Sequence, residues 1–202
     1  MNIILKITLA LFLFTVSSLY SQNEQDSLLK ILQSKFDSIE SFSVEFVQSN
    51  NGKINLSGTF YFKKENSIKI ISDELFITSD GETTWNYNKA ENKVIISNFD
   101  KTDPGVFSLN EIVYNFPEEC NITYGEDGKQ RFIIMKPAGY KYNFDSVELW
   151  ISDENLISKV VIIGSVTGKT KVEFSNYELN ADLKDTEFTF IPPEGSKIID
   201  LR

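Results

Sequence analysis

Two stretches of the chain place apolar residues at the spacing of a helix that covers an apolar surface. Within residues 24–40 the apolar side chains recur three or four positions apart and share one face: Leu28, Leu32, Phe36 and Ile39. Residues 108–116 repeat this spacing after a Pro-Gly break, and Pro117 follows them. An apolar stripe on a polar helix indicates packing against another element. The pattern therefore predicts an N-terminal helix and a short inserted helix that ends at Pro117.

From Phe42 onward the period changes to two. Apolar and polar residues alternate, for example, over residues 42–46 and 56–62. This alternation is typical of antiparallel strands with one buried face. Turn signals such as Asn51-Gly52 and Asp80-Gly81 separate the strands at short intervals and favour hairpins. We count about ten or eleven strands, and a sheet of that size is expected to curl.

The first residues have the layout of a secretory signal peptide. Residues 1–6 are a short basic start, residues 7–16 are mainly apolar, and residues 17–21 include small side chains. The apolar run is shorter than the roughly 20 residues that a membrane-spanning helix needs. We therefore expect residues 1–21 to be removed on export, with residues 22–202 forming a single domain. The alternative is an uncleaved N-terminal anchor.

Composition removes several kinds of chemistry. The 202 residues include no histidine and one cysteine, Cys120, so neither a histidine-based nucleophile nor a thiolate zinc cage can form within the chain. The net charge of −9 argues against nucleic-acid binding, which needs a basic face. Paired acids fall at predicted turns, where water solvates them. We therefore expect no catalytic residue, no metal and no cofactor.

The apolar features are the informative ones. Two amphipathic helices and a curled sheet with one apolar face can form an ordinary packed core. They can equally form a cavity with a helical lid that opens for an apolar ligand. Periodicity alone does not separate these two outcomes.

Four short motifs, in order, carry a family resemblance. Residues 42–48 read Phe-Ser-Val-Glu-Phe-Val-Gln, residues 58–64 read Gly-Thr-Phe-Tyr-Phe-Lys-Lys, residues 79–88 contain Ser-Asp-Gly and Trp-Asn-Tyr, and residues 188–195 read Phe-Thr-Phe-Ile-Pro-Pro-Glu-Gly. In these motifs and their spacing the chain resembles the outer-membrane lipoprotein carrier (LolA) family of Gram-negative bacteria. The resemblance implies an α+β, mainly antiparallel fold: an incomplete barrel of about eleven strands with a helical lid over a hydrophobic concave face.

The resemblance also implies a function. Members of the family are periplasmic carriers that bind the acyl chains of lipoproteins, receive them from an inner-membrane ABC transporter and pass them to an outer-membrane acceptor. We therefore expect a monomeric carrier rather than an enzyme, with acylated lipoproteins as partners and no nucleic acid. The alternatives are a half-barrel envelope-stress sensor that binds lipid or lipoprotein, and a hydrolase of envelope lipids or glycans.

The resemblance and the residue pattern together predict the site. Residues predicted to line the cavity are Phe42, Val44, Phe46, Leu56, Phe60, Phe62, Ile68, Ile70 and Trp85. Residues predicted to form the lid are Leu28, Leu32, Phe36, Phe107, Leu109, Ile112 and Val113. The family usually has an arginine after its second strand that latches the lid, whereas this chain has Lys64-Glu65. Lysine lacks the planar fork of arginine, so Lys64 is a candidate latch with fewer bonds.

Overall fold

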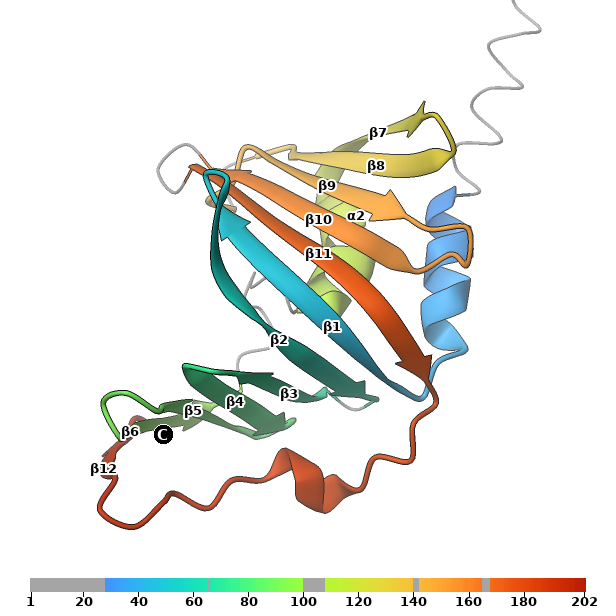
Figure 1. Ribbon diagram of the computed structural model, residues 1–202. Coiled ribbons are helices and arrows are strands. Elements are labelled where there is room, and N and C mark those ends of the chain that lie inside the picture. The colour runs from blue at the N-terminus through green and yellow to red at the C-terminus, as the bar shows by residue number, and fades with distance from the viewer. Residues whose placement is uncertain (1–27, 65, 100–107, 140–141, 165–167) are drawn as a thin grey trace, which may run out of the picture.

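The computed structural model describes residues 28–64, 66–99, 108–139, 142–164 and 168–202. Within these residues, twelve strands form one sheet in the order β12-β6-β5-β4-β3-β2-β1-β11-β10-β9-β8-β7 (Figure 1). The strands are β1 (Ser41–Asn50), β2 (Lys53–Lys63), β3 (Ser67–Ser72), β4 (Leu75–Asp80), β5 (Thr83–Asn88), β6 (Lys93–Asn98), β7 (Cys120–Asp127), β8 (Gln130–Pro137), β9 (Ser146–Ile151), β10 (Ile157–Gly164), β11 (Gly168–Leu179) and β12 (Lys197–Asp200). The predicted signal peptide, residues 1–21, lies outside the described residues.

The sheet is open, curled and mostly antiparallel. Within β1–β6 and within β7–β11, strands that follow each other in the sequence pair, and β1 joins the two halves by pairing with both β2 and β11. The first hairpin turns at Asn51 and Gly52, whose φ angles of 49° and 84° are the positive values that a tight two-residue turn needs. The edge strands β12 and β7 stand at opposite ends of the order and do not close the sheet. The predicted incomplete barrel with covering helices is therefore confirmed.

The strand count differs from the prediction by one short strand. After β11 the chain crosses beneath the sheet and ends as β12, which pairs in parallel with β6 (Figure 1). This connection contains η2 (Asp185–Phe188) and lies against the outer face of β3 and β4. A parallel pair needs a long crossover, so hairpin counting does not find β12.

Helical segments cover the other face of the sheet. One helix spans residues 28–37, here called the N-terminal helix. The second, here called the inserted helix, spans residues 109–119 and includes η1 (Glu111–Asn115) and α2 (Phe116–Glu119). The prediction that Pro117 ends this helix is wrong. Pro117 stands in the first turn of α2, where its missing N–H costs little, and the preceding turns form a π-helix.

The C-terminal connection gives the outer face a core of its own. Phe188 is fully buried there, and the ring of Phe190 stacks on that of Phe76 at 5.0 Å. Lys69 is only 7% exposed; its ammonium lies 4.3 Å from the centre of the Tyr61 ring and 3.1 Å from a Glu187 carboxylate oxygen. An ammonium group can be buried at low cost only when such partners replace water. The C-terminal connection therefore covers the outer face of β3–β5.

Candidate functional site

The concave face collects most of the residues predicted to line a cavity. Cross-strand partners in an antiparallel pair share a face, and the register pairs Val44 with Phe60 and Phe60 with Ile70. The same face carries Phe42, opposite Phe62, which in turn is opposite Ile68. In this cluster Phe42, Val44, Phe46, Phe60 and Ile70 are buried, and Leu56, Phe62 and Ile68 are partly buried against them.

The predicted lid residues meet this face. From the N-terminal helix and the inserted helix, Leu28, Leu32, Phe36, Leu109, Ile112 and Val113 are all buried in the same cluster. The two helices also contact each other, because the side-chain amide of Gln33 donates a hydrogen bond of 3.1 Å to the carbonyl of Val113. Phe107 lies outside the described residues. The helices thus act as a cover over the apolar face.

Trp85 is the exception among the predicted lining residues. Within β5, Asn86 pairs with Ile77 and Ile95 on the concave side, so Trp85 projects to the outer side with its partners Thr78 and Ile96. The prediction that Trp85 lines the cavity is therefore wrong. The physical reason is that the aromatic side of β5, which carries Trp85 and Tyr87, faces outward, where Tyr87 packs on Phe190 of the C-terminal connection. The polar Asn86 and Asn88 face the concave side instead.

A cluster of aromatic rings forms the part of the concave face that packs against Phe36 of the N-terminal helix. The Phe42 ring lies at its centre, 5.3 Å from the ring of Phe62, 5.5 Å from that of Tyr177, 5.8 Å from that of Phe60 and 6.2 Å from that of Phe36. Tyr177 donates a 2.8 Å hydrogen bond to the carbonyl of Ile157, and burial raises its pKa. Such edge-to-face and stacked ring pairs stabilise the contact between the N-terminal helix and the sheet.

A crevice of about 260 Å³ opens beside this cluster, where the helices meet the sheet. Its walls are Phe36, Asp37, Phe62, Lys64, Asn66, Leu109, Asn110 and Tyr114. Small-molecule sites usually occupy about 300–1,000 Å³. The crevice is smaller than that, and the buried side chains of both helices pack directly into the apolar cluster, so the helices are closed over this part of the face.

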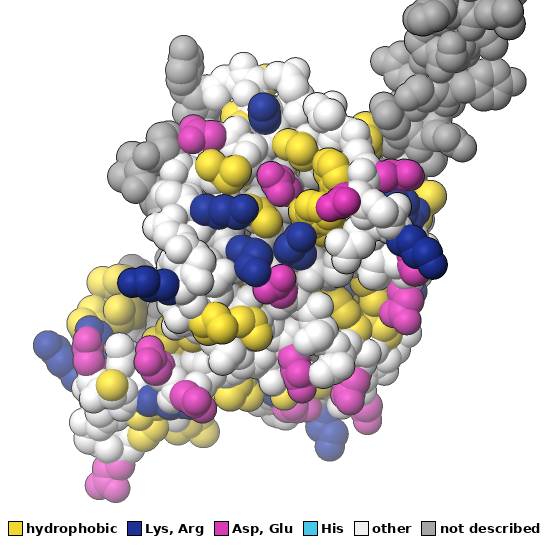
Figure 2. All heavy atoms as spheres, turned by 45° about the horizontal axis from the view of Figure 1, so that its top comes forward, with side chains coloured by type: hydrophobic (Ala, Val, Ile, Leu, Met, Phe, Trp, Pro, Cys, Tyr) yellow, Lys and Arg dark blue, Asp and Glu magenta, His cyan; other side chains and the backbone are white. Residues whose placement is uncertain are grey.

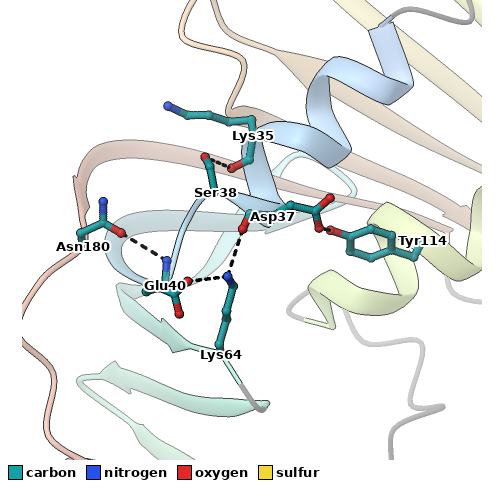
Figure 3. A network of polar contacts seen from close by, with 7 residues as sticks. All are labelled: Lys35, Asp37, Ser38, Glu40, Lys64, Tyr114 and Asn180. Carbon is teal, nitrogen blue, oxygen red and sulfur yellow. Dashed lines mark hydrogen bonds and ion pairs between the residues drawn. The ribbon is translucent and has the colours of Figure 1, made fainter.

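Polar contacts join three elements at the crevice (Figure 3). The Lys64 ammonium, at the end of β2, donates to the backbone carbonyl of Asp37 at 3.0 Å and to a Glu40 carboxylate oxygen at 2.6 Å. Tyr114 of the inserted helix donates a 2.5 Å hydrogen bond to the Asp37 carboxylate. Asn180, just after β11, accepts a hydrogen bond from the backbone N–H of Glu40. The N-terminal helix is thus tied at its C-terminus to both the sheet and the other helix.

The electrostatics of this network are those of a partly exposed contact. Burial, together with the hydrogen bond to Asp37 and its negative charge, raises the pKa of Tyr114 to about 12. The Lys64 side chain is 40% exposed, so its ion pair with Glu40 contributes little by itself. Its position at a helix C-terminus adds a favourable interaction with the helix dipole.

Of these residues, the sequence identified only Lys64. Among the others, only Asp37 has a signal in the sequence. It is an acid in the last turn of a helix, where the helix dipole disfavours a negative charge, so a hydrogen-bond donor from another part of the chain is needed to stabilise it.

The described residues include neither a cluster of metal-ligating side chains nor a helix that could span a membrane. Among them, no group of three or more metal-ligating side chains is close enough to hold an ion. Across the same part of the chain, no helix is both long and apolar enough to span a membrane. Figure 2 shows basic, acidic and apolar side chains intermixed, with no large field of either charge on that view.

Comparisons with known proteins agree with this architecture. A family model described as outer membrane lipoprotein carrier protein LolA matches residues 37–191. The outer-membrane lipoprotein carrier protein of Francisella tularensis subsp. novicida is 25% identical over 201 residues, covering 94% of each chain. An uncharacterized protein of Methanocaldococcus jannaschii is 23% identical over 192 residues; the match covers 88% of this chain and 54% of that one, so the chain spans about half of that relative.

Solved structures share the fold at low sequence identity. An uncharacterized conserved protein from Thermus thermophilus matches with a TM-score of 0.58 and 10% identity, covering 87% of this chain and 98% of that one. The structure of MucB matches with a TM-score of 0.53 and 12% identity, covering 83% of this chain and 63% of that one. These two likenesses concern the fold alone.

Proposed function

The chain belongs to the outer membrane lipoprotein carrier protein (LolA) family, and from this premise we propose that it carries acylated lipoproteins across the periplasm. In this proposal it takes them from an inner-membrane ABC transporter and delivers them to an outer-membrane acceptor. The acyl chains bind between the concave face and the two covering helices. The protein acts by binding and release and carries out no reaction.

One observation carries the proposal: helices close an apolar face, and partly exposed polar contacts among the described residues tie them down at the rim. An acyl chain in water costs about 0.8 kcal/mol for each exposed CH₂ group, so a carrier has to bury most of the chain. The buried side chains of both helices already supply an apolar counterpart to the face. Acyl chains can replace those contacts when the helices move outward.

Release follows from the same arrangement. A bound chain gains apolar contacts but displaces the contacts between helices and sheet, so the net affinity is lower than burial alone would give. The rim is closed by exposed contacts such as Lys64 with Glu40, which are individually worth about 1 kcal/mol or less. Most of the free energy of closure therefore comes from the buried helix side chains, and because a bound acyl chain has to displace them, its net affinity is low enough for an acceptor to compete.

The test is lipid loading with a matched pair of variants. Leu109 lines the crevice, whereas Ile54 is 73% exposed on β2. We expect Leu109→Glu to lose binding of a triacylated peptide, because a charge would stand where the acyl chain enters. Ile54→Glu is expected to bind like the unaltered protein, and circular dichroism checks that both variants are folded.

Transfer is tested separately, with spheroplasts as donors and outer-membrane vesicles as acceptors. An unaltered protein that takes up no acylated peptide and releases no lipoprotein from spheroplasts contradicts the proposal. Uptake without any transfer to acceptor membranes would favour the envelope-stress sensor instead.

A further inference from the structure

A second hollow lies beside the crevice and differs from it in chemistry. It is a groove of about 820 Å³ between the start of the C-terminal connection and the ends of β1–β4. It is lined by Glu40, Ser41, Lys63, Lys64, Ser67, Asp80, Asn180, Ala181, Asp182, Leu183 and Asp185. Most of these side chains are polar or charged, and both signs are present. The volume falls within the range of about 300–1,000 Å³ that is usual for ligand sites.

Lys64 forms the wall between the two hollows. Its ammonium donates one hydrogen bond to the carbonyl of Asp37, which lines the crevice, and one to the carboxylate of Glu40, which lines the groove. The apolar-floored crevice and the polar groove therefore meet at Lys64, whose contacts with Asp37 and Glu40 are drawn in Figure 3.

The groove is built rather than accidental, because several contacts tie the C-terminal connection to the ends of β1 and β2. Lys63 donates to the carbonyl of Leu183 at 3.0 Å and forms an ion pair with Asp185. Ser41 donates a 2.7 Å hydrogen bond to the carbonyl of Ala181. These contacts fix residues 181–185 as the outer wall.

We infer that the groove holds the first residues of the polypeptide that follows the acylated end of a lipoprotein, an inference that rests on the proposed carrier function. An acylated protein joins a strongly apolar part to a hydrated, extended part at a single residue. A site for it needs an apolar space and a polar channel side by side, and the two hollows meet this need at Lys64. Polar groups of both charge signs accept peptides of varied sequence, because they can replace water around backbone and side-chain groups alike.

The inference is tested by filling the groove while leaving the crevice open. Ser67→Trp and Ala181→Trp each place a large ring on a groove wall, at positions that are not fully buried. Ser57→Trp is the matched control, since Ser57 lines a separate depression of about 240 Å³. The ligands are a triacylated ten-residue peptide, palmitate and a diacyl phospholipid, and the measurement is the dissociation constant of each.

We expect both groove variants to bind the triacylated peptide about tenfold more weakly, because a loss of this size corresponds to the few contacts of a short peptide. Both variants are expected to bind palmitate and the phospholipid like the unaltered protein, since neither ligand carries a peptide. The control is expected to bind all three ligands normally. Equal weakening for phospholipid means that a lipid headgroup occupies the groove and overturns the inference. Unchanged peptide binding in both groove variants also overturns it.

A cross-linking experiment gives a readout that does not depend on the variants. A photoreactive residue at the third peptide position should attach to groove residues such as Asp182 of the unaltered protein. Attachment only at crevice residues overturns the inference while leaving the carrier function standing. If the unaltered protein binds no acylated ligand, the carrier function itself fails.

Discussion

The hydroxyl of Tyr114 is predicted to control how often the helical cover opens. It donates a 2.5 Å hydrogen bond to the Asp37 carboxylate and so ties the inserted helix to the end of the N-terminal helix. Tyr114→Phe removes this hydrogen bond and keeps the ring. A net hydrogen bond contributes about 0.5–1.5 kcal/mol, more when one partner is charged and less when the pair is exposed.

We therefore take about 1 kcal/mol for this contact, which corresponds to a roughly fivefold larger open population in Tyr114→Phe. The assay is amide hydrogen exchange over residues 28–37, which reports the local opening of the N-terminal helix. Tyr87→Phe is the control, because the Tyr87 hydroxyl donates to Asn92 in the β5–β6 hairpin, away from the cover. The control should leave exchange over residues 28–37 unchanged.

The pH dependence tests the same contact independently. Burial, followed by Asp37, raises the pKa of Tyr114 to about 12 from an ordinary value of 10.0. A raised tyrosine pKa means that the neutral hydroxyl stabilises the closed form fully below pH 10, and that this contribution disappears as the pH rises toward 12. Tyr114→Phe should lack this part of the alkaline opening. The reasoning is refuted if Tyr114→Phe opens like the unaltered protein, or if Tyr87→Phe shows the same increase.

Three further predictions concern stability. Leu32→Ala should lower the free energy of unfolding in urea by about 3 kcal/mol, because Leu32 is fully buried between helix and sheet. Ile31→Ala, at a position 38% exposed, should lower it by less than half as much. Equal losses in the two variants would contradict the packing. A backbone hydrogen bond at the start of η2 lowers the pKa of Glu187, and Lys69 lowers it further. The ionised Glu187 therefore stabilises the C-terminal connection above its unfolded pKa, and this contribution is lost as the pH falls through the lower folded value. Limited proteolysis of residues 180–196 should accelerate at acidic pH, and Glu187→Gln should be cleaved quickly at neutral pH too. Gly58→Ala should destabilise the fold by about 1–3 kcal/mol, since its Cβ would lie 1.9 Å from a backbone carbonyl oxygen of β3; unchanged thermal unfolding would argue against the β2–β3 register.

The spacing of apolar residues along the sequence accounts for most of the fold. Alternation along a strand and three-to-four spacing along a helix are local properties, so the hairpins, the two helices and the apolar face could be read from neighbouring residues. The predicted residues of β1–β3 share one face with the predicted helix residues for this reason. Local patterns fail where the apolar side of a strand faces outward against a distant segment, as at Trp85, and where two strands pair in parallel over a long crossover, as β12 does with β6.

Local patterns in the sequence do not determine the polar contacts at the rim of the site. Lys64 and Tyr114 both reach Asp37, from 27 and 77 positions away in the chain, and Asn180 lies 140 positions from Glu40. Which of these side chains meet depends on how far the sheet curls and where the C-terminal connection crosses it. By itself the sequence determined that an apolar face exists and that helices cover it, because burial of apolar surface follows from period. Only the tertiary structure decided where that cover is tied down and that a polar groove lies next to the apolar crevice, because those features are contacts between distant parts of the chain.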